Sequence, residues 1–296
     1  MKIAIDPVLC SGCNRCAQVC PLNFSETPRG KPQVADPVLT CFHCGHCVAV
    51  CPEEAVSHDG LSDLRFTPLR DLPAPAQFMS LLHARRSRRE FTLQPLSREE
   101  IDALLTAGAQ AANGLNRRDV GYTVVTEPAT LKELSRRIGK QTLWMAARLE
   151  SPLWRLVFRM LMGRGYKELE PLFPLFKPMA SALPRGRDMI LYDAPCAILI
   201  HTRPGDPCGA ENAVYSGANI LLAAEAMGLG ACVIGFLTEP VNRSQDLARL
   251  AGVPPGHKVH TSIVAGHPRF PYARGIAHPA PQGADGLSRG SSSPTA

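Results

Sequence analysis

The chain has 296 residues, of which 45% are hydrophobic and 20% are charged, and its formal net charge is +6. This composition is typical of a folded globular protein and excludes an intrinsically disordered chain, which carries too few apolar residues to build a core. The length permits one large domain, or a small domain followed by a larger one. The first ten residues, MKIAIDPVLC, lack the apolar core and cleavage site of a signal peptide, so we expect a cytoplasmic protein.

The N-terminal part of the chain is rich in cysteine. Eight of the eleven cysteines form two runs, CSGCNRCAQVCP at 10–21 and CFHCGHCVAVCP at 41–52, each with the spacing C-x2-C-x2-C-x3-C-P. Clustered thiols in a reducing compartment favour metal binding over disulfides. Zinc sites usually combine two separated C-x2-C pairs, so zinc is the weaker alternative for such compact runs.

These two runs resemble those of bacterial two-cluster ferredoxins, and the resemblance covers a predicted domain at residues 1–57. In the ferredoxin pattern, three closely spaced thiolates hold one [4Fe–4S] cluster, and the fourth cysteine, before proline, ligates the other. The resemblance therefore assigns the first cluster to Cys10, Cys13, Cys16 and Cys51. It assigns the second cluster to Cys41, Cys44, Cys47 and Cys20.

The next segment, residues 58–78, is expected to be a linker. Its second half, RFTPLRDLPAPAQF at 65–78, contains three prolines, which lack the backbone N–H donor that helices and sheets use.

A larger domain is predicted over residues 79–278. Ser97 is a candidate N-cap for a helix over 97–112, because two glutamates and apolar residues at helical spacing follow it. Strands and helices then alternate, which indicates an α+β or α/β domain. The expected strands lie at 121–127, 196–202, 231–236 and 261–268, and the expected helices at 129–139 and 210–228. The Pro-, Gly- and Ser-rich tail at 279–296 is expected to be disordered.

The most apolar run, residues 214–237, is long enough to be considered as a membrane span. It contains Glu225, and the sequence GLG at 228–230 would interrupt a helix. We therefore predict a buried helix followed by a core strand, and no transmembrane segment.

Five motifs in chain order carry a second resemblance, to the nitroreductase family of FMN-binding flavoproteins. They are ARRSRREF at 84–91, AANGLNRRD at 111–119, YDAPCAILI at 192–200, ILLAAEAMGLGACVIGF at 220–236 and IVAGHPRFPYAR at 263–274. The resemblance implies an α+β sandwich in which helices flank a mostly antiparallel sheet. It also implies a homodimer with FMN sites at the subunit interface.

The same resemblance assigns the flavin site. The family motif R-x-S-x-[RK], which holds the FMN phosphate and the pyrimidine edge, falls on Arg85, Ser87 and Arg89, and we count Arg86 with them. Guanidinium groups suit this role because they bind phosphate oxygens in pairs and stabilise negative charge on a reduced flavin. The remaining predicted contacts are Asn116, Ile234 and Gly235, with Arg269 or Arg274 closing on the phosphate. Arg118 stands where many relatives have glutamine, and this leaves the substrate open.

Residues 140–187 are a predicted helical insertion with nine Lys or Arg against three Glu and both tryptophans of the chain. We interpret the insertion first as a lid or a dimer arm. A docking surface for an acidic electron-transfer protein is the sharper alternative. Membrane association is weaker, and nucleic-acid binding is weaker still.

These features predict an iron–sulfur flavoprotein oxidoreductase in which two clusters pass electrons to FMN. No catalytic side chain is assigned, because the chemistry belongs to the flavin. A small organic acceptor such as a nitroaromatic compound or a quinone is expected. The donor would be reduced ferredoxin, flavodoxin, or NAD(P)H acting at the flavin face, because no G-x-G-x-x-G follows a strand. The alternative is an electron-transfer or redox-sensing module that serves a protein partner.

Overall fold

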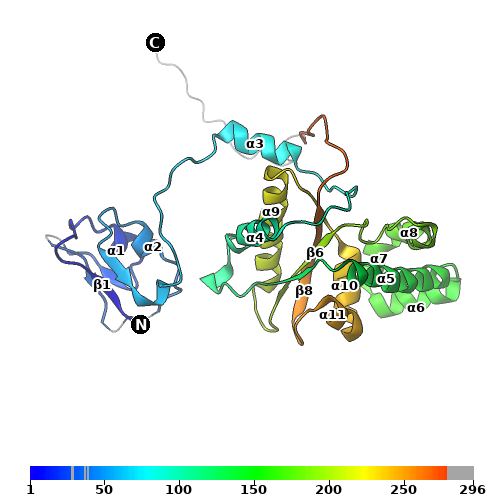
Figure 1. Cartoon of the computed structure of the whole chain (residues 1–296). Helices are drawn as coiled ribbons and strands as arrows, with labels where there is room; N and C mark the ends of the chain where they lie inside the picture. Colours follow the sequence, from blue (N-terminus) through cyan, green and yellow to red (C-terminus); the bar gives the residue numbers. More distant parts are fainter. Residues whose placement is uncertain (28–29, 37, 39, 279–296) are drawn as a thin grey trace, which may run out of the picture.

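The computed structural model describes residues 1–27, 30–36, 38 and 40–278. It shows a small N-terminal unit and a larger helix-rich domain joined by a long segment (Figure 1). The tail predicted at 279–296 lies outside the described residues.

The N-terminal unit is closed by its own two ends. Strand β1 (Ile3–Ile5) pairs antiparallel with β4 (Val56–His58), so the beginning and end of the unit lie side by side. A second pair joins β2 (Phe24–Ser25) to β3 (Gln33–Val34). The core is small and includes two thiols; its buried members are Ile3, Cys16, Ala17, Phe24, Cys47 and Val56. The 3-10 turn η1 (Asp59–Leu61) ends on the buried Leu61, so the unit extends a few residues beyond the predicted boundary at 57.

The linker is shorter than predicted, because helix α3 (Pro75–Ala84) begins inside it. The three prolines predict a segment without a helix, because proline disfavours the interior of a helix. Pro75, however, occupies the first helical position. There its fixed φ suits the helix, and the missing N–H would have no intrahelical partner in any case. The side chain of Gln77 accepts a hydrogen bond from the backbone N–H of Ala74 and completes this start.

The larger domain is built on a four-stranded antiparallel sheet in the order β5–β6–β8–β7. The antiparallel pairing agrees with the sheet that the family resemblance implies. Strand β6 is buried along its whole length, which places it at the centre. Its alternate residues serve two cores, as the pleat requires. The strands are β5 (Gly121–Val125), β6 (Cys196–Thr202), β7 (Gly230–Val233) and β8 (Lys258–Gly266).

Helices cover both faces of this sheet. On one face, α4 (Arg98–Ala109) and α9 (Gly209–Ala226) pack against Ile198, Ile200 and Ile263. On the other, α5 (Pro128–Leu149), α10 (Gly235–Arg243) and α11 (Gln245–Ala251) pack against Ala197 and Leu199. The predicted α+β sandwich is therefore confirmed. Within the described residues, no helix is long and apolar enough to cross a membrane.

Two predicted boundaries move. Strand β7 ends at Val233 rather than at residue 236, because Gly235 already begins α10. The predicted insertion at 140–187 begins inside α5, which continues without a break to Leu149. The rest of the insertion is helical, as expected: α6 (Pro152–Met162), α7 (Arg164–Leu169), η3 (Glu170–Leu172), α8 (Phe173–Ala182) and η4 (Leu183–Arg185).

Candidate functional site

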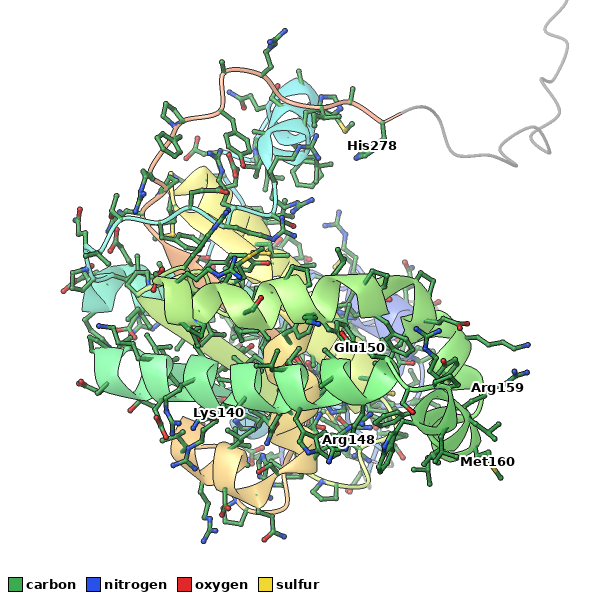
Figure 2. The ribbon with its side chains drawn as sticks, turned by 90° about the vertical axis from the view of Figure 1, so that its right-hand side faces the viewer. Lys140, Arg148, Glu150, Arg159, Met160 and His278 are labelled. Carbon is green, nitrogen blue, oxygen red and sulfur yellow. The ribbon has the colours of Figure 1, made fainter. Side chains whose placement is uncertain are left out.

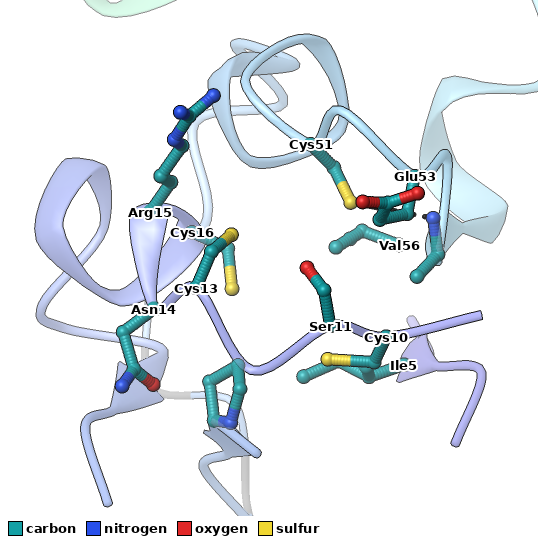
Figure 3. A pocket seen from close by; sticks show the side chains of 12 residues that line it. Ile5, Cys10, Ser11, Cys13, Asn14, Arg15, Cys16, Cys51, Glu53 and Val56 are labelled. Carbon is teal, nitrogen blue, oxygen red and sulfur yellow. Dashed lines mark hydrogen bonds between the residues drawn. The ribbon is translucent and has the colours of Figure 1, made fainter. Parts of the chain in front are cut away.

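The four thiols assigned to the first cluster face one pocket in the N-terminal unit. Cys10, Cys13 and Cys16 come from the first run, and Cys51 comes from the end of the second (Figure 3). The helix α1 (Arg15–Val19) starts at Asn14, whose left-handed φ of 57° turns the chain between the second and third thiols. Burial raises the pKa of the Cys16 thiol, and the nearby thiols of Cys51 and Cys10 raise it further.

The second set of thiols is grouped in the same interleaved way. Burial raises the pKa of the Cys47 thiol to about 11, and the nearby Cys20, Cys44 and Cys41 add to the shift. Thus Cys20, although it belongs to the first run, lies with the second set. The helix α2 (His46–Ala49) starts at Gly45 with φ 75°, which repeats the turn seen at Asn14.

Each set offers four thiols, the number of ligands that one [4Fe–4S] cluster requires. Among the described residues, no three His, Cys, Asp or Glu side chains approach closely enough to ligate one metal ion. Cysteine ligates a metal as the deprotonated thiolate, so the binding of iron by these sets would release protons. Hydrogen-bond donors that tune such clusters are in place, since the backbone N–H groups of Ala55 and His43 donate to Cys51 and Cys41 at 3.3 and 3.4 Å.

The segment that carries the R-x-S-x-R motif is extended and lies across the sheet edge; we call residues 85–91 the strap. Ser87 forms a parallel bridge with Ala231 of β7, and the N–H of Arg88 donates to the carbonyl of Ala231 at 3.1 Å. A Cβ at Gly230 would lie 3.0 Å from that of Arg88, so glycine is needed for this close approach. The strap therefore has a fixed register against β7.

Because the strap is extended, its side chains alternate between two faces. Arg85, Ser87 and Arg89 all act on the buried thiol of Cys232. Burial raises the pKa of this thiol, and Arg89, Ser87 and Arg85 oppose the increase. The motif residues thus converge on one face, where two cations and a hydroxyl are available to an anionic ligand.

Gly235, which the sequence assigned to the flavin face, lies at the end of β7 as the first residue of α10. A Cβ added to Gly235 would meet no protein atom within 4 Å, so the space beside it is open. Ile234 is buried, and its N–H is already bonded to the carbonyl of Ser262 at 2.8 Å. Gly235 thus follows closely on β7, the strand that pairs with the strap, and leaves space for a ligand on its open side.

The other face of the strap holds the C-terminal segment. Arg86 donates to the carbonyls of His83 and Ile276, so its guanidinium faces away from Cys232. Arg269 continues this packing, since its N–H donates to Glu90 O at 2.9 Å and its guanidinium to Phe91 O at 3.4 Å. Arg274 lies exposed in the same segment.

Arg88 is the anchor of the strap, and the sequence did not single it out. It is 8% exposed, forms an ion pair with Glu225 at 3.1 Å, donates to Phe270 O at 3.2 Å and lies 4.0 Å from the centre of the Tyr272 ring. The R-x-S-x-R spacing could have identified Arg88, because it lies between two positions of the motif that face the ligand. In an extended segment, the residue between two such positions points to the opposite side, which here is the protein interior. The sequence also did not single out Tyr192, whose ring centre lies 5.7 Å from the guanidinium carbon of Arg89.

Asn116 and Arg118 lie far from the strap within one chain. Asn116 is the last residue of η2 (Gly114–Asn116), and Arg118 follows it; the Gly114 N–H donates to Asn212 Oδ1 at 2.8 Å near the beginning of α9. Arg88 pairs with Glu225 at the other end of that helix. Thirteen residues of helix separate Asn212 from Glu225, or about 20 Å at 1.5 Å per residue. The predicted flavin residues therefore form two groups at opposite ends of α9.

Asn116 and Arg118 instead touch the N-terminal unit. The Asn116 amide donates to the carbonyls of Phe42 and His43, at 3.0 and 2.6 Å. Arg118 pairs with Asp63 at 2.9 Å. The sequence offered no sign of this contact between the two parts of the chain.

The basic insertion uses its central arginine internally. The guanidinium of Arg148 lies 3.6 Å from the centre of the Trp144 ring and 5.2 Å from that of Trp154. Arg155 donates to the carbonyl of Leu149 at 2.6 Å and caps the end of α5. Arg159 and Met160 project outward from α6 (Figure 2). Two of these three arginines, Arg148 and Arg155, therefore stabilise the joint between α5 and α6 and are not free to form a docking surface.

The nitroreductase family model matches residues 82–267, and the model of the 4Fe-4S dicluster domain matches residues 2–58. The first match spans more than half of the chain, so the chain belongs to the nitroreductase family, and it is an oxidoreductase with an N-terminal iron–sulfur domain.

Solved structures with similar folds include a nitroreductase with bound FMN from Bacteroides fragilis, at 21% identity and a TM-score of 0.49, covering 70% of this chain and 95% of that one. A nitroreductase with bound FMN from Desulfitobacterium hafniense is also 21% identical, with a TM-score of 0.48 and coverage of 68% and 93%. Among curated proteins, none matches this chain.

Proposed function

We propose that this protein binds one FMN and two [4Fe–4S] clusters and reduces a small organic acceptor such as a nitroaromatic compound, a quinone or a similar electrophile. The observation that carries the proposal is the extended strap paired with β7: its alternation puts Arg85, Ser87 and Arg89 on one face, and β7 leads to Gly235, which has open space beside it. This arrangement occurs in a chain that also gathers two interleaved sets of four thiols.

Each group of residues has a defined task in this proposal. Arg85 and Arg89 neutralise the phosphate and the pyrimidine edge of FMN, and Ser87 donates a hydrogen bond to it. The backbone at Gly235 supports the ring, and the thiolates hold the clusters. Bound FMN supplies the conversion between one-electron and two-electron transfer, which the side chains of the chain cannot perform.

Two features of the surroundings complete the proposal. The two groups of predicted flavin residues at opposite ends of α9 fit a homodimer in which each FMN lies at the interface. Thiolate ligands require a reducing compartment, so we place the protein in the cytoplasm. A reduced ferredoxin or flavodoxin, or NAD(P)H at the flavin face, would be the donor.

The test begins with anaerobically purified full-length protein. We expect about eight iron atoms and one FMN per chain, because two four-iron clusters are proposed. Steady-state reduction of a panel of nitro compounds and quinones should follow. A loaded protein that turns over none of these acceptors would favour the alternative of an electron carrier, and a protein without flavin would refute the proposal outright.

A further inference from the structure

The contact between the two parts of the chain involves only one of the two thiol sets. Cys41 belongs to the second set, and the two residues that follow it, Phe42 and His43, offer their carbonyls to Asn116. Cys41 also lines an open pocket together with Leu115, Arg117 and Arg118 of the larger domain. The second set of thiols is therefore adjacent to η2.

The pocket of the first set of thiols has a different lining. It is lined entirely by residues of the N-terminal unit, from Ile5 to Val56. Cys13, at the edge of that pocket, is exposed. Each set has one exposed thiol, Cys13 in the first and Cys44 in the second, so exposure does not distinguish the two sets. What distinguishes the second set is the pocket that Cys41 shares with the larger domain.

The backbone is unusual on both sides of the contact. Among the described residues other than glycine, nine have a left-handed φ, and four of these meet here: His43, Leu115, Asn116 and Arg118. Such conformations cost free energy and are found where a loop must hold a particular shape. The strain on both sides indicates that the contact has a function.

We propose that the second cluster, held by Cys41, Cys44, Cys47 and Cys20, is the exit of the electron relay, and that loop 41–43 docked on η2 is the route by which electrons leave it. This inference rests on the proposed function and adds direction to it. A low-potential one-electron donor protein reduces the first cluster, and single electrons then pass to the second cluster and across the contact. Two such transfers, with protons from water, complete the two-electron reduction of the flavin.

The ion pair between Arg118 and Asp63 holds the docked arrangement. Its side chains are 38% and 65% exposed, so the pair is weak and sensitive to salt. A contact of this strength can open and close, which makes it a suitable target for a charge reversal. Asp63 belongs to neither the thiol sets nor the predicted flavin site.

The experiment compares Asp63→Arg with the double variant Asp63→Arg/Arg118→Asp. Glu26→Arg is the matched control, because Glu26 is an exposed carboxylate of the N-terminal unit that lies outside the pockets of both thiol sets. Iron and flavin content are measured first, followed by hydrogen exchange of loop 41–43 and η2 and by the single-turnover rate of flavin reduction from a reduced ferredoxin. The hydrogen exchange reports the contact independently of turnover.

We expect Asp63→Arg to slow flavin reduction about fivefold at low salt and to increase hydrogen exchange in loop 41–43 and in η2. A factor of about five corresponds to the free energy that one exposed ion pair contributes. The double variant should recover the exchange protection, and Glu26→Arg should leave the protection unchanged. Unchanged exchange and rate in Asp63→Arg, in a protein with full iron and flavin, would overturn the exit route alone. Absence of flavin or iron from the wild-type protein would overturn the proposed function, and the exit route with it.

Discussion

Replacing Arg88 tests how the strap is held, because this residue anchors the motif without facing the predicted ligand. The side chains of Arg88 and Glu225 are only 10% and 12% exposed. Removing one partner from a buried ion pair leaves the other charge uncompensated, which costs about 3–5 kcal/mol. Arg88→Met also loses the contact with the Tyr272 ring. We therefore expect the free energy of unfolding of the larger domain to fall by about 3–5 kcal/mol.

The assay is urea unfolding under anaerobic conditions, followed by tryptophan fluorescence. Trp144 and Trp154 are the only tryptophans of the chain, and both lie in the larger domain, so the signal reports on that domain alone. The affinity for FMN, measured by flavin fluorescence, should fall as well, since Ser87 and Arg89 lose their register.

The double variant Arg88→Met/Glu225→Met separates charge from packing. With both charges removed, most of the lost stability should return, because no buried charge remains unpaired. Arg98→Ala is the control, since the pair between Arg98 and Asp102 is exposed at 83% and 50% and should contribute nothing measurable. A loss below about 1 kcal/mol in Arg88→Met, or an equal loss in the double variant, would refute this account of the strap.

Three further predictions concern other parts of the chain. Gly230→Ala should weaken FMN binding about tenfold or more, because the new Cβ would press on Arg88 and shift the strap, whereas Gly165→Ala, with open space around it, should leave FMN affinity unchanged. Cys44→Ser should lower the iron content by about four atoms per chain and remove one of two cluster signals in electron paramagnetic resonance; a full iron content would contradict the assignment of this ligand. His201 is buried beside His257 and His260, and burial above all lowers its pKa to about 4. As the pH falls, the unfolded state binds this proton before the folded state does. The contribution of His201 to the free energy of unfolding should therefore be fully present above about pH 6.5 and decline by at most about 3 kcal/mol as the pH falls to 4. His201→Gln should reduce this dependence on pH.

The sequence was most informative where spacing alone determines chemistry. Two copies of one cysteine run predict two thiol sets, and the structure places Cys20 with the second set because the two short helices pack against each other. The sheet was predictable for a similar reason, since its strands are short β-branched or apolar segments between clear helices. The confirmed strand over 196–202 is an example.

The remaining features depend on contacts that the sequence does not encode locally. Arg86 faces Ile276 because side chains alternate along the extended strap. The sequence does not show that residues 85–89 are extended, so this orientation could not be predicted from it. Asn116 was expected at the flavin, and only the packing of η2 against the start of α9 shows that it lies about 20 Å from the strap in one chain. The start of α3 at Pro75 was missed because proline was treated only as a helix breaker.

The length of α9 has a consequence for how the protein would retain its cofactor. If one FMN touches the strap end of one copy and the η2 end of another, flavin binding and self-association become thermodynamically linked. Free FMN would then favour the paired state, and pairing would tighten flavin binding by the same factor. Dilution should release FMN in proportion to the dissociation of the two copies, so the appearance of free-flavin fluorescence would report the concentration at which they separate.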